Sequence, residues 1–358
     1  MTAPRQKVLF TSHTANFQKF NRPFMRMLKE KGYTVHYASA GEEEILDADK
    51  AFVIPFERSP FSINNLRAIF QLKKVIDAEG YDIIHTHTPM GSVVTRLAAI
   101  AARKRGTRVI YTAHGFHFFK GAPLMNWLIY YPVEKIMAHF TDTLITINEE
   151  DYTRALKSFK TNVVYTSGIG VDLNKFQINM TKGERGAYRT SLGLELDDFV
   201  MIYVAELLPR KNQIWMISNI AGFLRTHEDA HLLLVGSDGM DGKCQKLVEQ
   251  LKLEEQIHFL GYRKDIVSLN NSSDLAVSSS TQEGLGIYQL EALATNTPIL
   301  GTKIRGHILE HMESYELNNS EEFNQKLDAL YVRLPHATFP EEFSLDSALK
   351  FHAGVYSI

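Results

Sequence analysis

Two carboxylates, Glu283 and Glu291, stand on either side of a short glycine-containing loop that leads into an expected helix. Gly284 and Gly286 give this loop a backbone that can turn its N–H groups toward a ligand. A helix N-terminus carries partial positive charge, so a phosphate fits there. An acid directly ahead of an anion site is unfavourable unless it hydrogen-bonds hydroxyls of the same ligand. The segment therefore predicts a sugar attached to a nucleotide diphosphate.

The periodicity of the following helix supports this placement. Ile287, Leu290 and Ala294 recur at i, i+3 and i+7, which places them against a sheet and leaves Tyr288 and Glu291 on other faces. The alternative is a surface loop followed by a solvated acid. The strand–glycine loop–helix order favours the ligand site.

A pair of cations, Arg210 and Lys211, follows another expected strand at the start of a helix. Cations oppose the helix dipole at that end, so their position is locally unfavourable. It is explained if they bind diphosphate oxygens through charge-assisted hydrogen bonds. A solvated Arg-Lys pair is the alternative.

A third candidate lies in TAHGFHFFKGAP, again directly after a strand. His114 can hydrogen-bond or exchange a proton near neutral pH, and Gly115 admits a ligand beside it; a purely structural histidine is the alternative. Zinc binding by this region's histidines is not expected, because His85 and His87 are assigned to opposite faces of their strand and no thiolate accompanies His114 and His117. No metal and no cofactor are predicted.

Composition bounds the remaining possibilities. The 358 residues suit two domains, and 44% hydrophobic with 22% charged residues is globular. The single cysteine, Cys244, excludes an internal disulfide and suits a reducing cytoplasm. No tract predicts a transmembrane helix, and the start predicts a strand rather than a signal peptide.

Charge is distributed unevenly. Residues 1–180 hold 23 Lys and Arg against 16 Asp and Glu, a balance of +7, whereas residues 181–358 have a balance of −9. The basic half includes two groups on or after expected helices, which are Arg22, Arg26, Lys29 and Lys31, and Arg103, Lys104, Arg105 and Arg108. These are either solvated helix faces or a surface for an anionic membrane or lipid substrate. Nucleic acid is not expected, because no nucleic-acid-binding motif accompanies the charge.

Alternating strands and helices predict an α/β fold with two doubly wound, mainly parallel sheets. The expected strands are 7–12, 34–39, 82–86, 108–113, 143–147, 163–166, 199–205, 230–236, 257–261, 275–279 and 298–301. The expected helices are 20–31, 63–79, 91–104, 126–140, 149–159, 213–226, 242–251, 266–271 and 287–294. We predict Rossmann-like domains at 1–180 and 187–335, a linker at 179–186, and a C-terminal helix within 340–358 that packs back on the first domain. Ligands are expected at the carboxyl ends of both sheets, in a cleft between the domains.

With these motifs in hand, the chain resembles a GT-B glycosyltransferase of retaining family 4, in the bacterial branch that builds capsules, exopolysaccharides and lipid-linked oligosaccharides. The resemblance covers nearly the whole chain and rests on DIIHTHTP, YTAHGFHFFKGAP, SGIGVDLNKF, ELLPRKNQ, GYRKDI and the E-x₇-E segment. It implies metal-independent transfer of a hexose or N-acetylhexosamine from a nucleotide sugar, with a UDP-sugar as the expected donor. The implied acceptor is an undecaprenyl-diphosphate-linked saccharide at the inner face of the cell membrane, to which the enzyme binds peripherally from the cytoplasm.

The resemblance also implies residue roles. Glu283 contacts the donor sugar and Glu291 the ribose, and His114 faces the reacting centre, with Glu283, Lys211 and His114 forming the catalytic set. The donor-binding residues implied are Arg210, Lys211, Tyr262, Arg263, Glu283, Gly284, Leu285, Gly286 and Glu291. His13, His117 and Lys120 are assigned to the acceptor side. The segment with Tyr262 and Arg263 could equally be a plain turn.

Three departures from the family pattern stand out. Glu206 occupies the position where the family usually has an arginine, the loop Thr11–Phe20 lacks the usual glycines, and the region after Arg305-Gly306-His307 is short. Two other functions remain open, namely a UDP-sugar 2-epimerase or hydrolase of the same architecture and a catalytically silent binding subunit.

Overall fold

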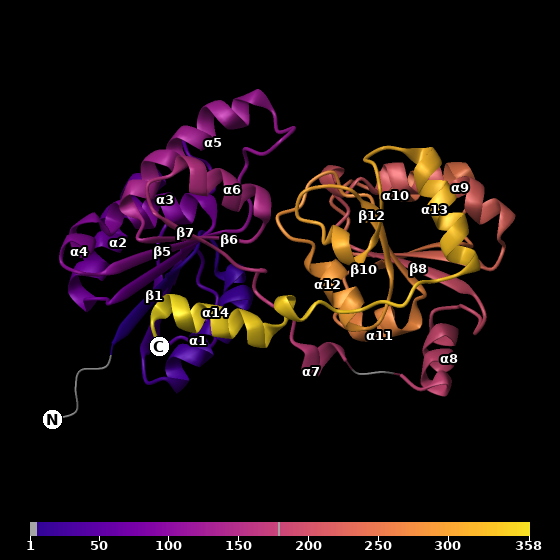
Figure 1. Cartoon of the computed structure of the whole chain (residues 1–358), viewed down its shortest axis with the longest axis horizontal. Helices are drawn as coiled ribbons and strands as arrows, with labels where there is room; N and C mark the ends of the chain where they lie inside the picture. The colour runs from indigo at the N-terminus through magenta and orange to yellow at the C-terminus, as the bar shows by residue number, and fades with distance from the viewer. Residues whose placement is uncertain (1–5, 178–179) are drawn as a thin grey trace. The chain divides into compact units, whose positions relative to one another are not determined.

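The computed structural model describes residues 6–177 and 180–358 and consists of two compact units (Figure 1). Unit 1 comprises Met1–Gly170 and Asp346–Ile358, and unit 2 comprises Val171–Leu345. The chain thus leaves unit 1 before the expected linker at 179–186. Most of that stretch begins helix α8, Lys182–Ser191, while residue 179 lies outside the described ranges.

Unit 1 is built on a parallel sheet. Within residues 6–177 seven strands pair in the order β3-β2-β1-β4-β5-β6-β7. Their bounds are β1 Lys7–Thr11, β2 Thr34–Ser39, β3 Lys50–Val53, β4 Ile83–His87, β5 Arg108–Ala113, β6 Thr143–Thr146 and β7 Asn162–Tyr165. The strand order reverses between β1 and β4, and in doubly wound sheets ligands bind beyond the carboxyl ends at such a point. A ligand of unit 1 is therefore expected at the loops after β1, β4 and β5.

Helices cover both faces of this sheet (Figure 1). They are α1 Gln18–Glu30, α2 Asn64–Glu79, α3 Pro89–Ala98, α4 Ile100–Lys104, α5 Leu124–Met137, α6 Glu149–Ser158 and α14 Leu345–Tyr356. Phe24 of α1 and Tyr356 of α14 pack with Ile110 of β5 on one face. Val109, the neighbour of Ile110, packs with Leu72 of α2 on the other. Side chains alternate along a strand, so this two-sided core follows from the apolar run in β5.

Arg96 anchors α5 to the rest of unit 1. Its guanidinium is fully buried and donates to Glu134 Oε2 at 2.9 Å and to Ser92 Oγ at 2.8 Å. It also lies 4.4 Å from the centre of the Tyr111 ring. A buried ion pair that is broken on one side costs about 3–5 kcal/mol, so this contact fixes α5 against α3 and β5.

Unit 2 repeats the plan. Within the described part of Val171–Leu345 six parallel strands pair in the order β10-β9-β8-β11-β12-β13. Their bounds are β8 Phe199–Val204, β9 Ala230–Val235, β10 Ile257–Gly261, β11 Leu275–Ser278, β12 Ile299–Thr302 and β13 Glu313–Tyr315. Here the order reverses between β8 and β11. The loops after these two strands contain the cation pair and the glycine loop singled out from the sequence.

The helices of unit 2 also lie on both faces of the sheet. They are α7 Leu173–Phe176, α8 Lys182–Ser191, α9 Gln213–Thr226, α10 Lys243–Leu251, α11 Ile266–Ser272, α12 Ile287–Ala294 and α13 Ser320–Val332. Ile217 of α9 and Leu327 of α13 share one core, and Leu269 of α11 and Leu290 of α12 share the other. No helix in the described ranges of either unit is long and apolar enough to span a membrane.

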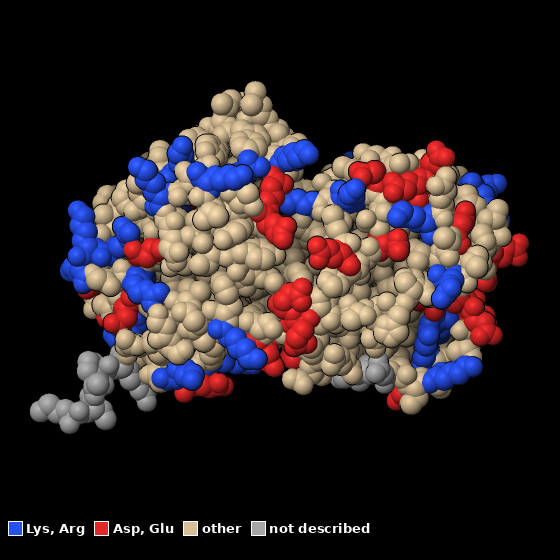
Figure 2. All heavy atoms as spheres, in the orientation of Figure 1, with Lys and Arg blue, Asp and Glu red and all other residues tan. Residues whose placement is uncertain are grey.

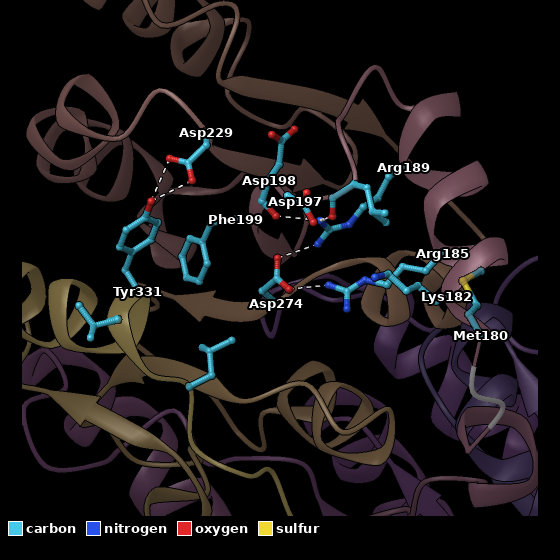
Figure 3. A pocket seen from close by; sticks show the side chains of 13 residues that line it. Met180, Lys182, Arg185, Arg189, Asp197, Asp198, Phe199, Asp229, Asp274 and Tyr331 are labelled. Carbon is cyan, nitrogen blue, oxygen red and sulfur yellow. Dashed lines mark hydrogen bonds and ion pairs between the residues drawn. The ribbon is translucent and has the colours of Figure 1, made fainter.

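A hollow of about 830 Å³ opens at the amino-terminal end of the unit 2 strands (Figure 3). Arg189 in its wall donates to Asp274 Oδ2 at 2.7 Å and to the Asp198 carbonyl at 2.7 Å. Arg185 also pairs with Asp274, at 2.5 Å. These contacts tie α8 to the starts of β8 and β11, so the arginines serve the fold. The hollow lies at the end of the sheet opposite the point where ligands are expected.

Candidate active site

Lys211 and Glu283 meet at the reversal point of the unit 2 sheet. The Lys211 ammonium donates to Glu283 Oε1, and Arg210 Nη1 lies 3.7 Å from Glu283 Oε2. The side chain of Glu283 is 10% exposed and that of Arg210 51%. Glu283 and Lys211 therefore form a sheltered pair, with Arg210 at its open side.

Hydrogen bonds to the backbone hold the cation-bearing turn in place. Tyr203 at the end of β8 donates its hydroxyl to the Lys211 carbonyl at 2.6 Å. Ser279 Oγ donates to the Asn212 carbonyl at 2.9 Å, and the Thr281 N–H to the Arg210 carbonyl at 2.8 Å. The loop after β11 thus positions the turn after β8, which brings the two sequence motifs together.

The glycine loop is closed by a second loop that follows β12. The Gly286 N–H donates to the Gly306 carbonyl at 2.7 Å. Gly306 has φ +82°, and a Cβ there would lie 2.7 Å from the Glu283 carbonyl, so only glycine fits without a shift. The Gly286 N–H thus has a backbone acceptor in this structure, and its use for the diphosphate stays a prediction. Leu285 and Gly284 precede it in the same loop.

His307 joins this site and was not predicted as part of it. Its Nδ1 lies 2.6 Å from the Thr302 carbonyl, and burial lowers its pKa to about 4. Glu283 and Lys211 are close enough to act on its charge. The available sequence signal is the Arg305-Gly306-His307 segment, which precedes the short region that departs from the family pattern.

The remaining donor-side residues are placed as follows. Glu291 is half-exposed on α12. Tyr288 was expected away from the sheet, but its hydroxyl donates to the Ile202 carbonyl at 3.2 Å and its ring packs on the core, so that expectation was wrong. Tyr262 is exposed after β10, and Arg263 is held by Asp265 at 2.6 Å.

The strand order explains why Tyr262 and Arg263 do not contact the Lys211–Glu283 pair. β9 and β8 separate β10 from β11, so Tyr262 and Arg263 start from a different part of the sheet edge than Glu283. Glu206 is exposed in the turn after β8.

In unit 1, histidines gather at the carboxyl ends of β4 and β5. The rings of His85 and His87 are 4.3 Å apart between centroids and so share one face of β4. This corrects the expectation of opposite faces, because a strand repeats every two residues. His87 Nδ1 lies 3.2 Å from His114 Nε2, and the Phe17 ring packs against His114 at 4.8 Å.

The C-terminal helix closes over this cluster. Tyr356 of α14 lies with its hydroxyl 2.6 Å from His85 Nδ1, while His85 Nε2 lies 2.8 Å from Thr112 Oγ1. His352, one turn earlier on α14, packs its ring on Phe24 of α1 at 4.0 Å. Sequence reasoning did not foresee these contacts. Over the described residues of both units, no three His, Cys, Asp or Glu side chains are placed to share a metal ion.

Burial lowers the pKa of each histidine in this cluster. The pKa of His114 and that of His352 fall to about 4, and those of His85 and His87 fall well below the usual value. An imidazole surrounded by aromatic rings loses hydration when charged, so the neutral form is favoured. The cluster is therefore uncharged near neutral pH.

We expect the stability of unit 1 to fall when the pH drops from 7 to 5. The unfolded chain binds protons on His114 and His352 below about pH 6.5, whereas the folded form does so only near pH 4. The free energy of unfolding should thus decrease by about 1.4 kcal/mol per pH unit for each such histidine in the window between these values. Urea unfolding at several pH values measures how the free energy of unfolding changes with pH. His114→Asn should reduce that pH dependence by the contribution of one histidine. A slope near zero between pH 7 and 5 would contradict the burial argument.

The acceptor-side residues predicted from the sequence are dispersed. The His13 N–H donates to Thr88 Oγ1 at 3.1 Å, which links the loops after β1 and β4 at the reversal point. The His117 ring stacks on Tyr130 of α5 at 4.6 Å. Lys120 is exposed, and its backbone N–H donates to Glu150 at 2.7 Å. Of the three, His13 lies at the place where ligands are expected.

Two parallel-sheet α/β units in one chain are the architecture of the GT-B fold. Family models agree, with "Glycosyl transferases group 1" matching residues 184–331 and "Glycosyl transferase 4-like" matching residues 7–148. The chain belongs to glycosyltransferase family 4, in the bacterial branch anticipated from its motifs.

Individual relatives narrow the comparison. EpsD of Bacillus subtilis, which is named a glycosyltransferase, is 41% identical over 334 residues, covering 91% of this chain and 87% of EpsD. The UDP-Gal:alpha-D-GlcNAc-diphosphoundecaprenol alpha-1,3-galactosyltransferase of Escherichia coli is 30% identical over 269 residues, covering 73% of this chain and 68% of its own.

Solved structures support the GT-B fold. HepE of Anabaena in complex with UDP and glucose superposes with a TM-score of 0.79 at 19% identity, over 99% of this chain and 100% of HepE. WaaG, a glycosyltransferase involved in lipopolysaccharide biosynthesis, gives 0.70 at 17% identity over 97% and 95%. At these identities the likeness establishes the fold.

Proposed function

We propose that this chain is a retaining glycosyltransferase that moves a hexose or N-acetylhexosamine from a UDP-sugar to an undecaprenyl-diphosphate-linked saccharide. The observation that carries the proposal is the sheltered Lys211–Glu283 pair at the reversal point of the unit 2 sheet. A cation and a carboxylate side by side suit a ligand with a diphosphate and sugar hydroxyls. The Escherichia coli relative, whose printed name gives a UDP-sugar donor and a diphosphoundecaprenol acceptor, supports the substrate classes.

Transfer breaks the bond between the sugar C1 and the diphosphate oxygen and forms one between C1 and an acceptor hydroxyl. The acceptor proton passes to a phosphate oxygen on the same face of the sugar, which retains the anomeric configuration. Stabilising the charge that grows on the diphosphate is the main task. Lys211 supplies a cation for it, the family pattern adds the backbone amides of Gly284, Leu285 and Gly286, and Arg210 adds a second charge. This role needs no bound metal or cofactor.

Glu283 serves the donor sugar. Its carboxylate accepts from Lys211 and retains capacity for sugar hydroxyls, since an ionised carboxylate has about four acceptor positions. Glu291 is assigned to the ribose hydroxyls and the segment with Tyr262 and Arg263 to the nucleobase. Each of these assignments comes from the family pattern.

His114 is proposed to donate a hydrogen bond through Nδ1. His87 Nε2 is buried without a partner among the described residues, while its Nδ1 faces His114 Nε2. A buried N–H without an acceptor is rarer than a buried unpaired acceptor, so the proton of His87 belongs on Nδ1, pointing at His114. His114 then carries its own proton on Nδ1. A neutral N–H donor suits an oxygen that gains negative charge.

Product analysis tests the proposal. We expect UDP release that depends on an added polyprenyl-diphosphate saccharide, with mass spectrometry of the lipid product showing one added hexose or N-acetylhexosamine. NMR of that product should show the donor's anomeric configuration. Comparable UDP release without acceptor indicates a hydrolase, a C2-inverted sugar indicates an epimerase, and no turnover with any donor in a panel of nucleotide sugars indicates a binding subunit.

The proposed place of action is the inner face of the bacterial cell membrane, reached from the cytoplasm. The +7 balance of residues 1–180 supports attraction to anionic lipid, and a lipid-linked acceptor requires access to the bilayer. His13, His117 and Lys120 remain assigned to the acceptor side on the family pattern.

A further inference from the structure

Helix α5 exposes a continuous apolar stripe. Leu124, Leu128, Pro132 and Ile136 repeat every four residues and so lie along one side of the helix. Leu124, Leu128 and Ile136 are 72%, 61% and 57% exposed. Met125 beside them is 60% exposed. An apolar face of this extent on an exposed helix marks an interaction surface.

The opposite side of α5 is fixed within unit 1, so the stripe is not a displaced core face. Glu134 and Met137 are buried, and Glu134 is the partner of Arg96. Tyr131 packs against Phe118 with ring centroids 5.4 Å apart. The helix therefore has its own core-facing side in place, and the stripe is a second apolar side that faces outward.

Positive charge flanks both ends of the stripe. Lys120 is exposed just before α5, and Lys135 is the one exposed charged residue within it, since Glu134 is buried. Beyond the C-terminal end of α5, Arg103 Nη1 donates to the His139 carbonyl at 3.1 Å. This contact places the C-terminal end of α4, with the exposed Lys104, near the C-terminal end of the stripe. Figure 2 shows a largely uncharged surface over α5, with blue lysines and arginines and some red acids beyond its border. Apolar faces bordered by lysine and arginine are typical of helices that lie in a membrane interface.

A second apolar stripe lies on the same face of the unit 1 sheet. Ile63, Leu66 and Phe70 at the start of α2 are 53% to 69% exposed. Val109 of β5 packs with α2, and Tyr111 and Ala113 of β5 pack with residues of α5. All three are odd-numbered residues of one strand, so α2 and α5 cover the same face of the sheet. Arg67, Lys73 and Lys74 are exposed on α2 beside this stripe.

We propose that the α5 stripe inserts into the boundary between headgroups and acyl chains of an anionic bilayer, with Lys120, Lys135 and Lys104 at headgroup level. This inference rests on the proposed lipid-linked acceptor and names the surface by which the enzyme reaches it. A lipid surface is favoured over a protein partner because α5 itself carries no exposed acid, while lysines stand at both ends of its apolar stripe.

Vesicle binding with matched variants tests the proposal. We expect the full chain to co-sediment with vesicles of phosphatidylcholine and phosphatidylglycerol. The double substitution Leu128→Glu and Ile136→Glu should weaken this by more than about tenfold, because two apolar side chains lose their burial and two acids meet anionic lipid. Val332→Glu changes a side chain that is 84% exposed in unit 2 and serves as the control, with unchanged binding. Equal binding of the double variant overturns the inference, as does a dimer of the wild-type chain that the variant dissociates.

A fluorescent probe on the α5 stripe tests membrane insertion independently, in case the two glutamate substitutions disturb folding. Cys244 is the single cysteine, so Cys244→Ala with Leu128→Cys allows one environment-sensitive fluorophore to be attached on α5. Its emission should rise and shift to the blue on adding the vesicles, whereas the same label at Val332→Cys should not change. A label at position 128 that stays in a watery environment when the protein is bound overturns the proposal.

Activity separates this inference from the proposed function. The double variant should transfer sugar to a short-chain, water-soluble acceptor as fast as wild type, and more slowly to an acceptor embedded in vesicles. No transfer by the wild-type chain to either acceptor contradicts the proposed function and leaves the vesicle-binding result to stand alone. Equal transfer to both acceptors by wild type and variant contradicts the α5 docking surface.

Discussion

Glu283→Ala should abolish sugar transfer, lowering kcat by about 10³-fold or more, while the fold stays intact. The carboxylate is proposed to hold the donor sugar, and it also fixes the Lys211 ammonium. Its loss therefore removes two interactions that act on the same donor. The measurement is acceptor-dependent UDP release under saturating donor.

A matched control separates this effect from a general loss of charge. Glu316 in the same unit pairs with Lys303 at 3.0 Å on the surface, and Glu316→Ala should leave transfer within about twofold, since exposed pairs contribute little. UDP affinity of Glu283→Ala, measured by calorimetry, should fall far less than kcat, because the cations Lys211 and Arg210 remain although Lys211 is less firmly held. Near-normal transfer by Glu283→Ala would remove Glu283 from the site.

Much of the fold could be predicted because its signals are local. Strand β2 and helices α9 and α12 were placed from apolar periodicity and agree with the structure at both ends. Each buries an apolar face that is continuous in the sequence, so the period alone identifies it.

The elements that were missed are short, lie at edges, or carry mixed signals. Strand β3 at the edge of its sheet is only KAFV and is mostly exposed. Helix α8 has a full capping box between Thr181 and Glu184, but the polar sequence of its first turns made the stretch resemble a linker. Helix α13 was overlooked although Phe323, Leu327 and Leu330 follow a helical period, so there a usable signal was present.

The candidate site likewise contains residues that local sequence indicates and contacts that it does not. Lys211 and Glu283 were found because each follows a strand and sits in a loop with its own chemistry. The hydrogen bond between Gly286 and Gly306, and that between His85 and Tyr356 across 271 positions, depend on how distant segments pack. No local pattern encodes such contacts, which is why His87, His307 and the α14 residues were not assigned to the site.

His114→Ala should lower kcat by about 10²–10³-fold, the usual effect of removing one donor to a developing negative charge. The expected loss is in kcat rather than KM, because the hydrogen bond strengthens as the diphosphate departs. Steady-state kinetics with donor and acceptor varied separately give both parameters. A variant that loses only donor affinity would assign His114 to ground-state binding.

The state of the His114 proton depends on His87, and two substitutions there separate orientation from packing. His87→Leu removes the Nδ1–H that faces His114 Nε2 and should lower kcat by about tenfold or more, whereas His87→Asn offers an amide N–H near the same place and should restore part of it. Long-range ¹⁵N NMR of the imidazoles reads the tautomers directly. Wild type should show protonated Nδ1 on both His87 and His114, with the His114 signal shifting toward a mixture in His87→Leu. Protonated Nε2 on His114 in the wild-type protein would reverse the argument, because His114 would then present an acceptor to the substrate and could not stabilise a departing phosphate by donation.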